Sequence, residues 1–151
     1  MNAYDKLTGA LIGLAKTTFN DAHSPALLQL LLDGLRAEET MDPARLAALT
    51  DSAAAMKRAY APGCADCASP CGRTADYDLD LLRAAPTELR ADKERLLFCL
   101  RSIAAGCSSW RELSPETAQL LLDGLCAVGE ASDQAFIRPC LQRAEEHIKK
   151  Q

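Results

Sequence analysis

Apolar residues, most of them leucine, recur every three or four positions along most of the chain, with polar residues between them. This spacing places apolar side chains on one face of an α-helix. Alternation with a period of two, which is typical of strands, is absent, and only 5% of the residues are aromatic. The pattern therefore predicts an all-α fold.

One segment of the chain occurs twice. Residues 24–37 and 114–127 share ten identities in fourteen positions, at a constant offset of 90 residues. Each copy begins with Ser-Pro, where serine is a favourable N-cap and proline is tolerated at the first helical position. Each copy also has a glycine inside the predicted helix, Gly34 or Gly124. A helical glycine costs about 1 kcal/mol relative to alanine, so its recurrence indicates close packing against another helix.

Helical patterns flank both copies of the repeat. We therefore expect two pseudo-repeated three-helix units, residues 1–60 and residues 87–151, that form one helical bundle. Residues 61–86 join these units as a cysteine-rich loop followed by a short helix over 75–83, and Pro139 is expected to shift or kink the last helix. The flanking apolar stripes are Leu7, Leu11, Leu14 and Thr18; Leu46, Leu49, Ala53, Met56 and Tyr60; Leu96, Leu100 and Ile103; and Ile137, Cys140, Ala144 and Ile148.

The loop contains the strongest candidate for chemistry. Cys64, Cys67 and Cys71 have the spacing Cys-x2-Cys-x3-Cys and lie among prolines and glycines that favour tight turns. Thiolates this close in sequence converge on one centre only where the backbone turns tightly, as in the cysteine loops that hold iron–sulfur clusters. The sequence therefore predicts a metal or iron–sulfur site at these three cysteines.

Composition and charge narrow the choice of partners and compartment. The formal net charge is −4, and the 17 basic residues are interspersed with the 21 acidic ones, which argues against nucleic-acid binding. Charged residues and glycines interrupt the apolar stretch within residues 1–19, so neither a signal peptide nor a membrane span is expected. Seven cysteines, an odd number, fit a reducing compartment better than a disulfide framework. We therefore expect a cytoplasmic protein.

Several segments resemble the N-terminal helical domain of the hybrid-cluster proteins, also called hydroxylamine reductases. The Cys-x2-Cys-x3-Cys-Gly-Arg run is also similar to the cluster loop of the nickel carbon monoxide dehydrogenases. The resemblance covers residues 60–150 directly and residues 1–60 through the repeat. It implies paired three-helix bundles and a cluster, 4Fe–4S, that relays electrons, with a redox partner protein or a second copy of the chain as partner. The segments are Cys71-Gly72-Arg73-Thr74, residues 96–101, residues 116–122 and residues 136–141.

The sequence departs from this family in two respects. The family's catalytic cluster is carried by later α/β domains, for which 151 residues leave no room, so its enzyme activity is not expected here. The family's loop supplies four cysteines and this loop three, so a complete cluster needs a further ligand. Cys107, which follows Gly106 at a helix end, is the best candidate. The alternatives are Cys99, Cys126, Cys140, a histidine or a cysteine of a second subunit. Cys99, Cys126 and Cys140 lie in apolar helical stretches, where we expect them to pack in the core.

Two other interpretations of the loop stay open. A structural zinc site would use the same thiolates and could recruit His23 or His147 as its fourth ligand. Alternatively, the thiols are free or oxidised. With either a structural zinc or a free-thiol loop, the alternative function is a non-enzymatic interaction module whose leucine-rich faces pack against a partner or a second copy. The sequence contains no catalytic triad and no Gly-x-Gly phosphate loop. We therefore expect an electron-transfer or accessory module rather than an enzyme.

Overall fold

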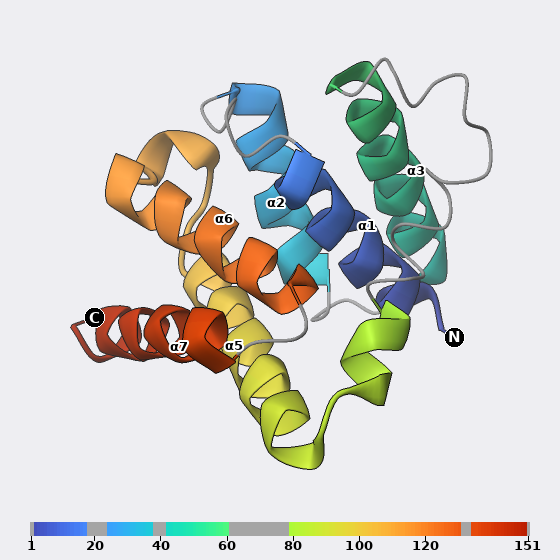
Figure 1. Ribbon diagram of the computed structural model, residues 1–151. Helices are drawn as coiled ribbons and strands as arrows, with labels where there is room; N and C mark the ends of the chain where they lie inside the picture. Colours follow the sequence, from blue (N-terminus) through green and yellow to red (C-terminus); the bar gives the residue numbers. More distant parts are fainter. Residues whose placement is uncertain (1, 18–23, 38–41, 61–78, 131–133, 151) are drawn as a thin grey trace.

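The computed structural model describes residues 2–17, 24–37, 42–60, 79–130 and 134–150 (Figure 1). These residues form helices and turns and contain no strand, so the predicted all-α class is confirmed. None of the helices described has the length and apolar content that a membrane crossing requires. The elements are α1 (Ala3–Thr17), α2 (Pro25–Arg36), α3 (Pro43–Tyr60), a short helical segment over 79–84, α5 (Thr87–Ala105), the 3-10 helix η4 (Trp110–Glu112), α6 (Pro115–Gly129) and α7 (Gln134–Lys149).

Both copies of the repeat form a helix that begins at the proline, α2 at Pro25 and α6 at Pro115. Ser114 caps α6 as predicted, since its Oγ accepts a hydrogen bond from the backbone N–H of Thr117 at 3.1 Å. Ser24 has the extended backbone of an N-cap residue, but its side chain accepts no such hydrogen bond. The predicted side-chain cap is therefore confirmed only in the second copy.

The glycines of the two repeat helices lie against leucine side chains, as their recurrence indicated. A Cβ atom at Gly34 would lie 2.6 Å from Leu11 Cδ1, and one at Gly124 would lie 2.8 Å from Leu100 Cδ1. Both leucines are buried, at 2% and 0% exposure. The glycines thus allow α2 to approach α1, and α6 to approach α5, more closely than an alanine would.

The helices of the two predicted units share one core (Figure 1). α1 packs along α3 and against α6, while α5 packs along α7 and against α2, so the units contact each other crosswise. Leucines at matching repeat positions, Leu32 and Leu122, are completely buried. The leucine-rich faces therefore pack inside the chain, and a partner protein would need another surface. That the two three-helix units are equivalent as wholes stays a prediction. Pro139, which was expected to shift or kink the last helix, lies inside α7.

Charged residues are also buried in this helical core. Lys57 on α3 and Asp92 on α5 are each 8% exposed, and Lys93 on α5 is fully buried. Burial lowers the pKa of Lys93 from its ordinary value of 10.5. Asp92 Oδ2 lies 3.0 Å from Arg138 Nε on α7, an ion pair that joins these two helices. The apolar periodicity of the sequence gave no sign of these buried charges.

Candidate functional site

The predicted metal loop lies outside the described residues, together with His23. The site at Cys64, Cys67 and Cys71 therefore stays a prediction. Within the described parts of the chain, no group of three or more His, Cys, Asp or Glu side chains is placed to hold a metal ion. The four cysteines found there are all free thiols.

The structure does describe both ends of the loop segment. On one side, α3 ends at Tyr60 and packs along α1. On the other side, Leu79 and Leu82 are buried, and Arg83 Nη2 forms an ion pair with Asp5 Oδ2 of α1 at 3.3 Å. The chain on either side of residues 61–78 is thus attached to the same helix.

Cys107, the predicted fourth ligand, lies just beyond the C-terminal end of α5. Its Sγ donates a hydrogen bond to the carbonyl oxygen of Ile103 at 3.3 Å, and burial raises the pKa of its thiol. The helical segment 79–84 follows the loop in the sequence and is joined through residues 85–86 to the N-terminal end of α5, a 19-residue helix that is about 28 Å long at 1.5 Å per residue. In this arrangement Cys107 is a hydrogen-bonded thiol at the far end of α5 from that junction.

Cys99 packs in the core, as predicted. It is 6% exposed on α5, and burial raises the pKa of its thiol. Cys140 on α7 is similarly buried, at 7% exposure, whereas Cys126 on α6 is only partly buried. The core prediction is therefore confirmed for Cys99 and Cys140 and holds only in part for Cys126.

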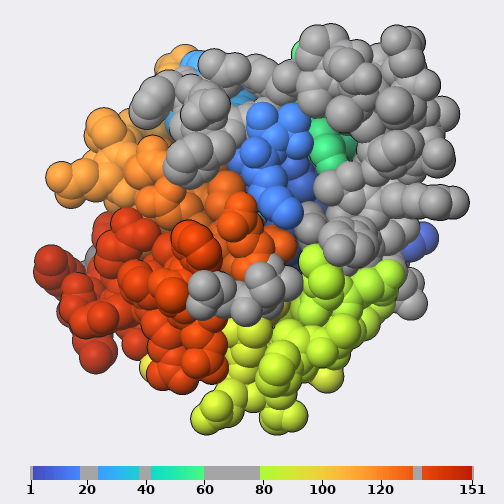
Figure 2. Space-filling view, in the orientation of Figure 1, coloured from blue at the N-terminus to red at the C-terminus, as the bar shows by residue number. Residues whose placement is uncertain are grey.

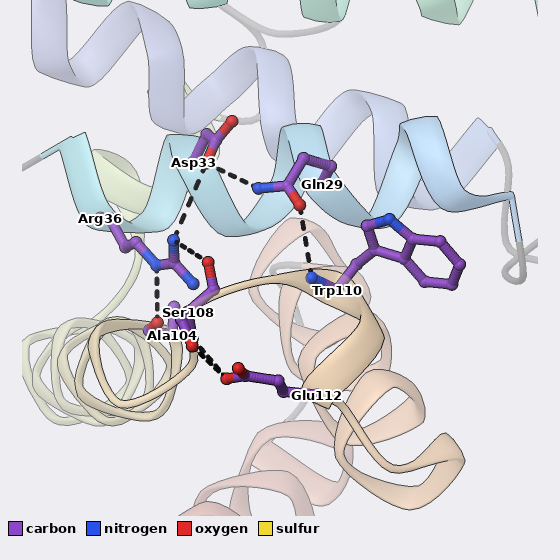
Figure 3. A network of polar contacts seen from close by, with 7 residues as sticks. All are labelled: Gln29, Asp33, Arg36, Ala104, Ser108, Trp110 and Glu112. Carbon is purple, nitrogen blue, oxygen red and sulfur yellow. Dashed lines mark hydrogen bonds and ion pairs between the residues drawn. The ribbon is translucent and has the colours of Figure 1, made fainter.

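A network of polar contacts joins α2 to the turn that follows α5 (Figure 3). Arg36 Nε donates to the carbonyl oxygen of Ala104 at 2.8 Å, and Arg36 Nη1 donates to that of Ser108 at 3.3 Å. In the same network, Gln29 Oε1 accepts a hydrogen bond from the backbone N–H of Trp110 at 3.3 Å. The guanidinium thus satisfies carbonyl groups at the C-terminal end of α5, where the helix dipole also favours a cation.

The second copy of the repeat keeps only part of this arrangement. Gln119 Nε2 donates to Asp123 Oδ1 at 2.8 Å, as the equivalent glutamine and aspartate of α2 do at 2.9 Å. The residue equivalent to Arg36 is Cys126. Because cysteine has no guanidinium, Cys126 cannot form the pair of hydrogen bonds that Arg36 forms.

A cavity of about 460 Å³ lies where α1, α6 and α7 meet. In the space-filling view, the blue surface of α1 borders the orange surface of α6, and the red surface of α7 borders α6 on another side (Figure 2). The wall of the cavity is mostly apolar and includes Cys126, Cys140 and the ring of Phe136. Lys16 and Arg143 contribute positive charges to it, and Asp123 on α6 and Glu130 just after α6 contribute two carboxylates.

Arg143 connects α7 to α6 at this cavity. Its Nη1 lies 3.4 Å from Asp123 Oδ2, and its Nη2 donates to Cys140 Sγ at 3.3 Å, a hydrogen bond that raises the pKa of Arg143. Cys140 Sγ donates in turn to the carbonyl oxygen of Asp123 at 3.8 Å. Burial raises the pKa of Cys126 to about 12, so its thiol is neutral at neutral pH.

The sequence interpretation treated Cys126 as a core residue and did not anticipate the cavity. The repeat itself contains a signal that could have revealed it. From the glutamine to the final alanine, residues 29–37 and 119–127 differ only at Arg36 and Cys126. Because Arg36 is large and Cys126 is small, this difference indicates that the space beside the two positions is filled to different extents.

Comparison of the chain with family models, with curated proteins and with solved structures found no match. The likeness to the hybrid-cluster helical domain thus stays an expectation drawn from the segments quoted above.

Proposed function

We propose that this protein is a small helical metal-binding module in which Cys64, Cys67 and Cys71 hold an iron–sulfur cluster. It would act as an electron-transfer or accessory protein and not as an enzyme. The observation that carries the proposal is the Cys-x2-Cys-x3-Cys spacing in a segment rich in proline and glycine. Thiolates at this spacing suit iron, or zinc as the alternative metal, because both accept soft sulfur ligands.

The described helices support this proposal through the two ends of the loop. α3 packs along α1, and the segment 79–84 is attached to α1 by the ion pair between Arg83 and Asp5. A loop whose ends are already held in place loses less conformational entropy when its side chains converge on a metal ion. The helical core would thus serve as the scaffold for the cysteine loop.

Cys107 stays our candidate for a fourth ligand within the chain. It is partly exposed, whereas Cys99 and Cys140 are buried. A ligand role requires Cys107 to lose its proton and to exchange the hydrogen bond to Ile103 for a bond to the metal, since the thiolate is the form that binds. If a second copy of the chain supplies the ligand instead, Cys107 is dispensable.

The test is anaerobic purification from iron-supplemented cells, followed by a visible absorption spectrum and by analysis of iron, sulfide and zinc. Wild type should show a broad visible band with bound iron and sulfide, and Cys67→Ser should lose both. Cys126→Ser is the matched control, because it removes a thiol outside the loop and should keep the cluster. Cys107→Ser should lose the cluster if Cys107 is the fourth ligand, and should keep it if another group is. Bound zinc in a colourless protein would mean that the loop is a structural zinc site and not a cluster site. Absence of bound metal in wild type would overturn the proposal.

A second candidate function is that of a helical interaction module, possible with or without a metal. The observation that favours it is Phe98, which is 66% exposed on α5 between the buried residues Leu97 and Cys99. Single exposed apolar residues are common on protein surfaces, but aromatic residues are enriched in interfaces, so Phe98 is the residue to test. Sedimentation of wild type and Phe98→Ser tests self-association through this residue. A monomeric wild type would exclude a dimer formed there.

A further inference from the structure

The cavity between α1, α6 and α7 lies beside Cys126, the position at which the first copy of the sequence repeat has Arg36. On α2, the side chain of Arg36 extends to Ala104 and Ser108 and occupies the space beside the end of α5. On α6, the equivalent residue is Cys126, and a cavity of about 460 Å³ is found beside it. This volume lies within the range of about 300–1,000 Å³ that small-molecule sites occupy in proteins.

The wall of the cavity suits an aromatic ligand. It combines the ring of Phe136 with the sulfur atoms of Cys126 and Cys140. Burial raises the pKa of Cys126, so that this thiol presents neutral, polarisable surface. Sulfur atoms and aromatic rings make favourable contacts with one another, as offset or edge-on aromatic pairs also do.

The charges at the cavity balance one another. Lys16 and Arg143 are opposed by Asp123 and Glu130. Asp123 accepts a hydrogen bond from Gln119 at 2.8 Å and lies 3.4 Å from the guanidinium of Arg143. Lys16, Glu130 and Arg143 are exposed, and the two positive and two negative side chains leave the wall with no net formal charge, which gives a charged ligand no net attraction and favours a neutral one.

We propose that this cavity is a binding site for a small, neutral aromatic molecule, held between α6 and α7 with Cys126 and Cys140 in its wall. The residues that form this wall belong to α1, to α7 and to residues 123–130, and the proposal does not require the cysteine loop to bind a metal. The ligand would occupy the volume that corresponds to the side chain of Arg36 in the first copy of the repeat.

The test is a fluorescence titration of the full chain with N-phenyl-1-naphthylamine, a neutral aromatic probe. Wild type should bind it saturably with a stoichiometry of one. Cys126→Arg restores the residue found in the first copy and fills the cavity, so it should weaken binding by at least about tenfold, which corresponds to about 1.4 kcal/mol. Cys126→Ala keeps the cavity open but removes one sulfur contact, so it should lose much less affinity than Cys126→Arg. Ser102→Arg is the matched control, because it adds an arginine on the exposed surface of α5, outside the cavity, and should bind like wild type.

Two further measurements keep the result unambiguous. Circular dichroism of each variant checks that the helices are intact, and Cys140→Phe fills the cavity from α7 if Cys126→Arg does not fold. The anionic probe 1-anilinonaphthalene-8-sulfonate tests the ligand class, and it should bind more weakly than the neutral probe. Absence of saturable binding in wild type, equal binding by the filled variants, or a preference for the anion would each overturn the proposal.

Discussion

The guanidinium of Arg36 on α2 donates a hydrogen bond of 2.8 Å to the carbonyl oxygen of Ala104, 68 residues later at the end of α5. A second hydrogen bond, to the carbonyl oxygen of Ser108 at 3.3 Å, extends this contact into the following turn. Arg36 belongs to the first copy of the repeat, and both acceptors belong to the predicted second unit. One side chain thus joins the two halves of the protein. The carbonyl oxygen of Ala104 also accepts a hydrogen bond from the backbone N–H of Cys107 at 3.1 Å, so Arg36 adds a second donor there.

Replacing Arg36 by alanine should lower the free energy of unfolding by about 1–3 kcal/mol, because the carbonyl oxygens of Ala104 and Ser108 lose a charged donor. Urea denaturation measures the change. Arg90→Ala is the control, since Arg90 forms an exposed ion pair with Glu94 on its own helix at 3.3 Å and should contribute only about 0.3–0.5 kcal/mol. Equal losses in the two variants would contradict a special role for the Arg36 bridge.

Replacing a helical glycine by alanine usually raises the free energy of unfolding, but the contact between Gly34 and Leu11 should make Gly34→Ala lower it. In wild type, Gly34→Ala places a Cβ 2.6 Å from Leu11 Cδ1, and overpacking of this kind costs about 1–3 kcal/mol. That cost exceeds the gain in helix propensity of about 1 kcal/mol, so the variant should be less stable or at best neutral. In a Leu11→Ala background the clash is absent, and the same substitution should stabilise the protein by up to about 1 kcal/mol. A double-mutant cycle in urea measures the coupling, and additive effects would show that the contact does not matter.

The two repeat serines should differ in their contribution to stability. Ser114→Ala removes the hydrogen bond from the backbone N–H of Thr117 and should cost about 1 kcal/mol. Ser24 accepts no such bond, so Ser24→Ala should change the free energy of unfolding by less than about 0.5 kcal/mol. Thermal or urea unfolding of the two variants gives the comparison. A loss at Ser24 as large as that at Ser114 would mean that Ser24 caps α2 in solution.

The folded state should lose stability as the pH rises above 9.0, in part because of Cys126. Burial is the main reason that its pKa rises from the ordinary 9.0 to about 12 in the folded protein. Between these values the unfolded chain releases the proton while the folded protein keeps it, so the contribution present below pH 9.0 is lost as the pH approaches 12. Cys126→Ala should therefore show a weaker decline of the free energy of unfolding above pH 9.0 in urea titrations.

Lys93 acts in the opposite sense over part of this range. Burial lowers its folded pKa below 10.5, so its contribution to stability rises as the pH approaches that value. Lys93 is present in both wild type and Cys126→Ala, so this effect cancels in the comparison between them. Identical pH dependence of the two proteins would show that Cys126 titrates in the folded state as it does in the unfolded chain.

The positions of the helices follow from local properties of the sequence. The Ser-Pro pairs predicted where α2 and α6 begin, because capping and proline geometry depend only on neighbouring residues. The repeat also predicted that Gly34 and Gly124 would lie in close helix contacts. The 3-10 helix η4 was not predicted, since a single short turn carries no periodic signal.

Which helices meet across the two halves was decided only by the tertiary structure. The apolar spacing shows which face of each helix is buried but not which other helix that face packs against. The crosswise packing of α1 on α6 and α2 on α5 could therefore not be derived from periodicity. The same holds for the burial of Lys93 and for the cavity beside Cys126, which depend on side chains far apart in the sequence. The sequence by itself determined where helices form and indicated a cysteine loop, because caps, apolar spacing and cysteine spacing are local features. The tertiary structure decided what each helix face packs against, because burial is a property of all the helices together.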